Sequence, residues 1–204
     1  IEFFFNLLSF SILTSFINLI IIRHSDKNLN VSTHKGLAKF FIVCIPSIIV
    51  GLFILKYFQE FINFKLLVSI VIIISVSVVL LKDKIKIRIN FFRISILSIV
   101  GLIHGLTNSG GTLMSLALSN NTQKDNARYS ITFFYLALAT FQYLTTIIIF
   151  KNLYFLPLNF YLISSLISGV VLGNIFIKFI SENKYKLAEN VLALSSSIIF
   201  IINI

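Results

Sequence analysis

Seven apolar stretches, each close to the length that crosses a lipid bilayer, make up most of this 204-residue chain. A membrane-spanning helix needs about 20 apolar residues to cross a hydrocarbon core of ~30 Å. The chain is 57% hydrophobic and 12% charged, so it lacks the polar surface of a water-soluble domain. We therefore expect an all-α, polytopic membrane helix bundle that forms one membrane domain, 1–204. The stretches are 3–22, 36–56, 64–81, 94–119, 130–150, 158–180 and 187–204.

The basic residues of the chain lie mostly between these stretches. There are 17 Lys and Arg against 7 Asp and Glu, and five of the basic residues fall within 82–93. Lys and Arg in short loops mark the cytoplasmic side of a membrane protein. We interpret 82–93 as a basic cytoplasmic linker, and we expect the lipid bilayer, not a nucleic acid, to be the partner of this charge.

Few residues of the chain offer acid–base, nucleophilic or metal chemistry. All seven carboxylates lie in connectors or near the ends of apolar stretches, so none marks a proton relay at the membrane centre. The lone cysteine, Cys44, has no partner thiol, and His104 is the one histidine in the middle of a stretch. We therefore expect no enzyme, no catalytic residues, no metal and no cofactor.

Two parts of the chain match at an offset of 122 positions. Gly51 to Glu60 and Gly173 to Glu182 share the pattern Gly-x4-Lys-aromatic-x2-Glu. Lys and aromatic residues close many membrane helices, which is the alternative explanation. A duplication predicts a first repeat at 1–81 and a second at 94–204. The first repeat then lacks its Gly-rich segment, which we expect to precede Ile1, so that the chain is an N-terminal truncation.

The stretch 94–119 has an interior that suits a continuous membrane helix poorly. Between Gly105 and Thr112 it holds three glycines together with Asn, Ser and Thr, which compete with helical hydrogen bonds. We expect two half-helices, the second beginning near 110–113, with free amides that attract anions. The alternative is that Gly101 and Gly105 serve only to bring helices close together.

The distribution of charge predicts how this segment meets the membrane. If all seven stretches cross, the connectors hold nine basic residues on one side and seven on the other. If 94–119 enters and leaves on one face, the count becomes thirteen against three. The positive-inside rule favours the second arrangement, which leaves three crossings in each repeat and inverts one repeat relative to the other.

The sequence around this break resembles the second-repeat signature of the sulfite exporter TauE/SafE family. The resemblance rests on Gly-Leu-Ile-His-Gly-Leu-Thr-Asn-Ser-Gly-Gly-Thr at 101–112, followed by Ala127-Arg128 and Ser130-Ile-Thr132. It implies a multi-pass secondary transporter, an exporter of small sulfur-containing or organic anions such as sulfite or sulfonates, in the bacterial inner (cell) membrane. The alternative is a non-transporting membrane partner or assembly protein, and homo-oligomerisation stays open.

The candidate substrate-binding residues lie at the break and on the next stretch. The side chains or amides at the break bind a small anionic substrate under this hypothesis, or they cap the half-helices instead. His104 is a candidate for proton coupling, and its alternative is packing with one hydrogen bond. Gln142 and Asn18 are further candidates for lining the site. The substrate-binding candidates are Thr107, Asn108, Ser109, Gly110, Gly111, Thr112, Ser130 and Thr132.

Overall fold

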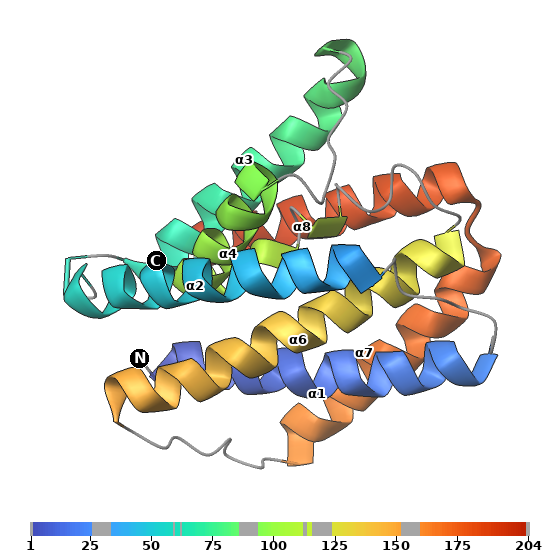
Figure 1. Cartoon of the computed structure of the whole chain (residues 1–204). Coiled ribbons are helices and arrows are strands. Elements are labelled where there is room, and N and C mark those ends of the chain that lie inside the picture. Colours follow the sequence, from blue (N-terminus) through green and yellow to red (C-terminus); the bar gives the residue numbers. More distant parts are fainter. Residues whose placement is uncertain are drawn as a thin grey trace.

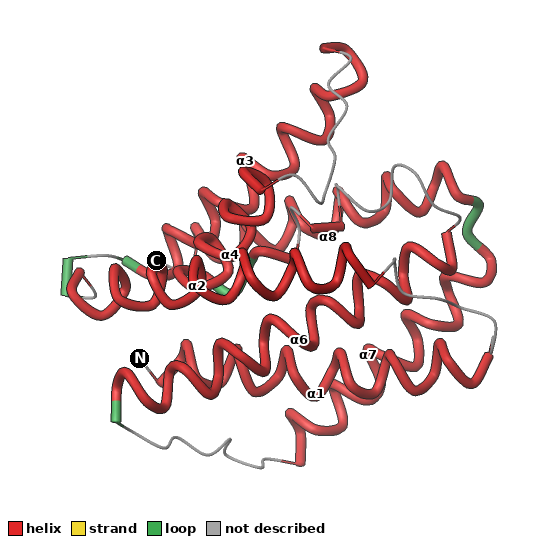
Figure 2. Tube along the Cα trace, viewed as in Figure 1, coloured by secondary structure: helices red, strands yellow, loops and turns green. Residues whose placement is uncertain are grey.

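The computed structural model describes residues 2–25, 34–58, 60–61, 63–85, 94–111, 114–115, 124–151 and 160–202. These ranges are helical apart from short turns, and no strand occurs within them (Figure 2). The prediction of an all-α bundle is therefore confirmed. The helices are α1 (Glu2–Ser25), α2 (His34–Phe58), α3 (Phe64–Ile85), α4 (Ile94–Thr107), α6 (Lys124–Phe150), α7 (Phe160–Phe179) and α8 (Glu182–Ile202).

Three of these helices are long and apolar enough to cross a membrane. In the described part of the chain the spans are Phe5–His24, Ala38–Phe58 and Asp125–Phe150. Shorter apolar segments lie in α3, α4, α7 and α8. Several helices also extend past the apolar stretches into polar sequence, so that α6 begins at Lys124 and α8 at Glu182. The chain is therefore an integral membrane protein.

The long helices run alternately in opposite directions. Figure 1 shows α6 packed antiparallel to α1, and the two helices are in contact. Figure 1 shows α3 diverging from α1, α2 and α6 toward its C-terminal end.

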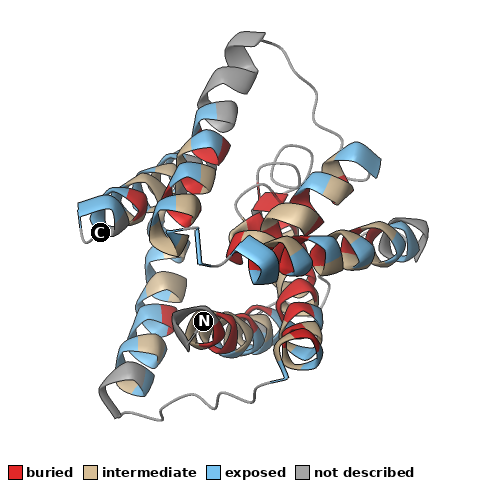
Figure 3. Cartoon of the chain, turned by 90° about the vertical axis from the view of Figure 1, so that its left-hand side faces the viewer, coloured by how far each residue is buried: buried red, intermediate tan, exposed pale blue. Residues whose placement is uncertain are grey.

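The main apolar core lies where α1, α2, α4 and α6 meet. Figure 3 shows the buried residues gathered in this group of helices, whereas α3 and α8 are more exposed. A smaller cluster of Val68, Ile72 and Val76 joins α3 to α8. Leu97 and Val100 of α4 belong to the main core, and Asn108 after it is buried, so protein covers the non-helical backbone that lipid would not tolerate. The buried members of the main core are Leu8, Phe40, Cys44, Ile48, Leu52, Leu55, Leu97, Val100, Met114, Phe134, Leu138 and Ile149.

Candidate functional site

The helical path of the segment 94–119 breaks at Asn108. Helix α4 ends at Thr107, and Asn108 has a backbone φ of 58°. Its amide still donates to the carbonyl oxygen of His104 at 2.8 Å, which closes the last turn. Asn is the residue other than Gly that most readily adopts this left-handed conformation at a helix end. The predicted break is therefore present, and an asparagine makes the turn.

The two glycines after the break are needed for close packing. No described glycine has a positive φ, so neither Gly110 nor Gly111 makes the turn. A Cβ built on Gly110 would lie 2.7 Å from the Cβ of His104, and one on Gly111 would lie 2.5 Å from the Tyr135 ring. Helical structure resumes at these two residues and is present again at 114–115, as predicted.

Gly101 and Gly105 lie on the side of α4 that packs against α2. A Cβ on Gly101 would lie 2.6 Å from the carbonyl oxygen of Cys44, and one on Gly105 would collide with the backbone of Ile48. On α2, Gly51 returns the contact, since its Cβ would lie 2.5 Å from the carbonyl oxygen of Leu102. For this pair of glycines the structure supports helix packing, and we call this contact the α2–α4 seam.

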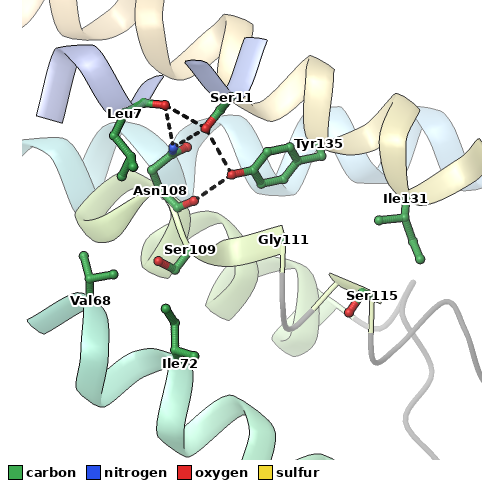
Figure 4. Close-up of a pocket in the computed structure, with 10 residues that line it drawn as sticks. All are labelled: Leu7, Ser11, Val68, Ile72, Asn108, Ser109, Gly111, Ser115, Ile131 and Tyr135. Carbon is green, nitrogen blue, oxygen red and sulfur yellow. Dashed lines mark hydrogen bonds between the residues drawn. The ribbon is translucent and has the colours of Figure 1, made fainter. Parts of the chain in front are cut away.

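A partly open pocket of about 380 Å³ lies beside the break (Figure 4). Four helical elements and the break itself contribute to it. Five of the ten lining residues carry a hydroxyl or amide group and none is charged, although most of the lining surface is apolar. These residues are Leu7 and Ser11 of α1, Val68 and Ile72 of α3, Asn108, Ser109, Gly111 and Ser115 of the broken segment, and Ile131 and Tyr135 of α6.

Hydrogen bonds hold the break against two long helices at the edge of this pocket. The amide nitrogen of the Asn108 side chain donates to Ser11 Oγ at 2.6 Å (Figure 4). The hydroxyl of Tyr135 donates to the backbone carbonyl oxygen of Asn108 at 3.0 Å and lies 3.3 Å from Ser11 Oγ. The Asn108 side-chain oxygen is buried and has no partner among the described residues. Asn108 is therefore the residue at which α1, α6 and the break meet.

The structure places three of the predicted residues on the pocket wall: Asn108, Ser109 and Gly111. Thr107 is fully buried, where its hydroxyl donates to the carbonyl of Ile103 and accepts from the amide of Ser109, so it acts as a cap. Four further candidates are placed away from the lining, and Thr112 lies outside the described residues. The four are Gly110, Ser130 and His104, which are buried, and Thr132, which is partly buried.

His104 lies behind the pocket. Its side chain is fully buried, and its ring packs edge to face on Tyr135 with 5.3 Å between the ring centroids. Neither ring nitrogen has a hydrogen-bond partner in the described part of the chain. The ring of Tyr135, which does line the pocket, is thus the contact between His104 and the pocket wall.

Gln142 and Asn18 make quite different contacts. The Gln142 amide, fully buried in α6, donates to the carbonyl oxygens of His104 at 2.5 Å and Gly105 at 3.3 Å. It therefore holds the last turn of α4. Asn18 of α1 instead accepts a hydrogen bond from Asn174 of α7 at 2.8 Å. Neither residue lines the pocket.

Sequence reasoning did not identify most of the pocket residues outside the break. Ser11 and Tyr135 are far apart in sequence and meet only because α1 packs on α6. Ser11 is one of many serines in apolar helices, and its neighbours gave no signal. Tyr135 follows the predicted Ser130 and Thr132 on the same helix, and its phenol is the polar group of that helix that reaches the break.

Residues suited to metal binding do not gather in the described ranges. Within them no three His, Cys, Asp or Glu side chains come together. The pocket instead presents neutral hydroxyl and amide groups that can donate hydrogen bonds. Such groups recognise oxygen-rich ligands through hydrogen bonding alone.

A bundle of apolar helices that contains a broken helix, with a pocket at the break, defines a polytopic membrane protein with a discontinuous helix. Discontinuous helices form the binding sites of many transporters. The family model described as sulfite exporter TauE/SafE matches residues 6–200. The chain therefore belongs to the TauE/SafE family of membrane transporters. Neither a curated protein nor a solved structure matches it significantly.

Proposed function

We propose that the protein is a secondary transporter that exports small sulfur-containing or organic anions, such as sulfite or sulfonates, across the bacterial inner membrane. The anion binds in the pocket at the α4 break. The observation that carries this proposal is the position of Asn108, where a helix break, two hydroxyl-bearing helices and the pocket coincide.

The break lies deep enough to serve as a transport site. Helix α4 has 14 residues before Asn108, and at 1.5 Å per residue they span about 21 Å. This length exceeds half of a hydrocarbon core of ~30 Å. A polar group at that depth is costly unless it faces protein or a hydrated cavity, which favours a functional role for the Asn108 side chain.

The polar part of the pocket suits an oxyanion. A sulfite or sulfonate group has oxygens that only accept hydrogen bonds, while Asn108, Ser109, Ser115, Ser11 and Tyr135 all carry donors. Hydrogen bonds from neutral donors to a charged acceptor contribute about 1.5–3 kcal/mol each. Several such bonds offset the cost of removing the anion from water.

The apolar part of the pocket suits the carbon chain of an organic anion. Leu7, Val68, Ile72 and Ile131 form this part of the wall. A pocket of about 380 Å³ is larger than a bare sulfite ion requires. The lining therefore favours a short alkanesulfonate over sulfite as the better fitting substrate.

His104 is the proposed site of proton coupling. It lies behind Tyr135, so a proton from His104 would act on the pocket through the movement of this ring. Replacing His104 with Gln is expected to leave downhill flux measurable and to remove its acceleration by an imposed pH gradient. If the gradient accelerates the His104→Gln variant as much as the unmodified protein, His104 has no coupling role.

Flux from proteoliposomes tests the transport proposal. Vesicles containing the protein and loaded with radiolabelled sulfite or ethanesulfonate are expected to release the anion faster than protein-free vesicles. Asn108→Leu removes the amide and is expected to lower this flux at least tenfold. The control Ser195→Ala, on α8, removes an exposed hydroxyl bonded only to Leu192 and is expected to retain full flux.

Two results would contradict the proposal. Full flux in Asn108→Leu would place the site elsewhere in the protein. The absence of flux for both anions, with correctly folded protein in the vesicles, would favour a non-transporting membrane partner or assembly protein.

A further inference from the structure

The helices α6, α7 and α8 begin 122, 126 and 118 positions after α1, α2 and α3. Helix α1 begins at Glu2 and α6 at Lys124, 122 positions later. Helix α2 ends at Phe58 and α7 at Phe179, 121 positions later. Helices α3 and α8 then close the two halves. The spacing agrees with the 122 positions between Gly51 and Gly173.

The contacts between helices are those expected if the two halves of the chain are related by symmetry, so that α1, α2 and α3 correspond to α6, α7 and α8. The pairs α1–α6 and α3–α8 are in contact, and each pair consists of two corresponding helices. The contact of α2 with α6 maps onto the contact of α7 with α1, and both are present. The contact of α2 with α4 maps onto a contact between α7 and a further helix. No helix in the described part of the chain takes that place.

The α2–α4 seam has an open counterpart on α7. On α2 the seam includes Ser47, whose Cβ would lie 2.8 Å from a Cβ on Gly101, and Gly51. The residues 122 positions later are Gly169 and Gly173. No described atom lies within 4 Å of a Cβ built on either glycine. Small residues at the same two positions are therefore packed on α2 and uncovered on α7.

The difference in exposure extends around α7: Ile167 and Val171 are 48% and 44% exposed, whereas their counterparts Ile45 and Ile49 are partly buried. On the outer side, Val50 of α2 and its counterpart Leu172 of α7 are 50% and 52% exposed. Next to the seam, Phe176 of α7 is 61% exposed, whereas its counterpart Ile54 is partly buried. On α1, Leu13 is exposed, although its counterpart Tyr135 packs on Gly111 after the break.

We propose that the Gly169–Gly173 face of α7 is the docking surface for a second discontinuous helix of the α4 type. Such a helix is apolar and carries two small residues four positions apart. These residues pack on Gly169 and Gly173 as Gly101 and Gly105 pack on α2. The close approach of helix backbones at small residues stabilises such pairs in lipid. The inference rests on packing and is independent of the transported substrate.

Cross-linking tests this docking surface. The probe is a synthetic peptide of residues 94–119 with Gly101→Cys, added to vesicles that contain the full chain with Cys44→Ser and Gly169→Cys. The peptide presents the α4 seam, and position 169 corresponds to Ser47, which faces Gly101 in the structure. Mild oxidation is expected to form the peptide–chain disulfide at least five times faster than in the Leu172→Cys control.

A further variant and two outcomes decide the proposal. Adding Gly173→Leu to the Gly169→Cys chain fills the open seam and is expected to slow the disulfide by the same factor. Equal rates at positions 169 and 172 would show that the peptide meets α7 only by random collision. Disulfides between two Gly169→Cys chains, formed in preference to the peptide adduct, would show that a second copy occupies the surface.

Discussion

The α2–α4 seam gives the most direct prediction of stability. In Gly105→Ala the added methyl group meets the backbone of Ile48, whose Cα lies 3.0 Å and carbonyl carbon 3.1 Å from the built Cβ. Both atoms belong to a helix backbone, so no side-chain rotation relieves the contact and the helices must separate. Overpacking of this kind costs about 1–3 kcal/mol.

The expected shift follows from this cost. Alanine recovers up to about 1 kcal/mol relative to glycine as a helix former. Because the contact is with helix backbone, we use the upper part of the overpacking range, about 2–3 kcal/mol, which leaves a net loss of about 1–2 kcal/mol. At about 2–4 °C per kcal/mol for a chain of this size, the unfolding midpoint falls by about 2–8 °C. The separation also weakens the hydrogen bonds from Gln142 to the last turn of α4.

The chain provides its own reporter for this experiment. Cys44 is the only cysteine, is fully buried, and donates its thiol to the carbonyl of Leu97 across the seam at 3.2 Å. Labelling of Cys44 by a thiol-reactive dye during heating in detergent therefore reports the opening of the seam. Ser95→Ala, on the exposed start of α4, is the matched control and should leave the midpoint unchanged. An unchanged midpoint in Gly105→Ala would refute the seam geometry.

Three further predictions concern the residues that hold the break. Asn108→Gly and Asn108→Ala both lose the hydrogen bond to Ser11, but only alanine is strained at a φ of 58°. The Cys44 labelling midpoint should therefore be lower for Ala than for Gly, by the equivalent of about 1–2 kcal/mol. Gln142→Leu removes the side-chain donor to the carbonyls of Gly105 and His104, of which His104 keeps the Asn108 amide, and should lower the midpoint by the equivalent of about 1–3 kcal/mol. Tyr135→Phe keeps the ring against Gly111 but removes the donor to Asn108, so anion flux from proteoliposomes should fall while the midpoint shifts by no more than about 1.5 kcal/mol. Equal midpoints for the two Asn108 variants would contradict the strain at Asn108. An unaffected midpoint in Gln142→Leu, or an unaffected flux in Tyr135→Phe, would contradict the role given to that residue.

The sequence predicted the break because several local signals agreed there. Three glycines and three short polar side chains in the middle of an apolar stretch cannot all be explained by a continuous helix. The prediction placed a Gly-rich loop between two half-helices, and within this loop Asn108 makes the turn. The role of Gly110 and Gly111 depends on how close His104 and Tyr135 come, and that distance is set by tertiary packing.

The remainder of the pocket could not be predicted from local sequence. Ser11 looks like any other serine in an apolar helix, and it becomes a partner of Asn108 only through the packing of α1 across α6. Ser130 and Thr132 were chosen because they lie near the break in sequence, yet Ile131 and Tyr135 are the α6 residues that face the pocket. The rotation of α6 about its own axis decides which of its residues face the pocket, and the positions of polar residues in an apolar helix do not reveal that rotation.

The central claim is that an anion occupies the pocket at the α4 break, and protection of a thiol in that pocket tests it most directly. The protein with Cys44→Ser and Ser109→Cys carries a single thiol on the pocket wall. We expect ethanesulfonate, but not an equal concentration of ethanol, to slow its alkylation by N-ethylmaleimide, while Leu172→Cys on α7 reacts at the same rate with or without the sulfonate. Unchanged alkylation of Ser109→Cys at sulfonate concentrations that saturate flux would show that the transported anion binds elsewhere.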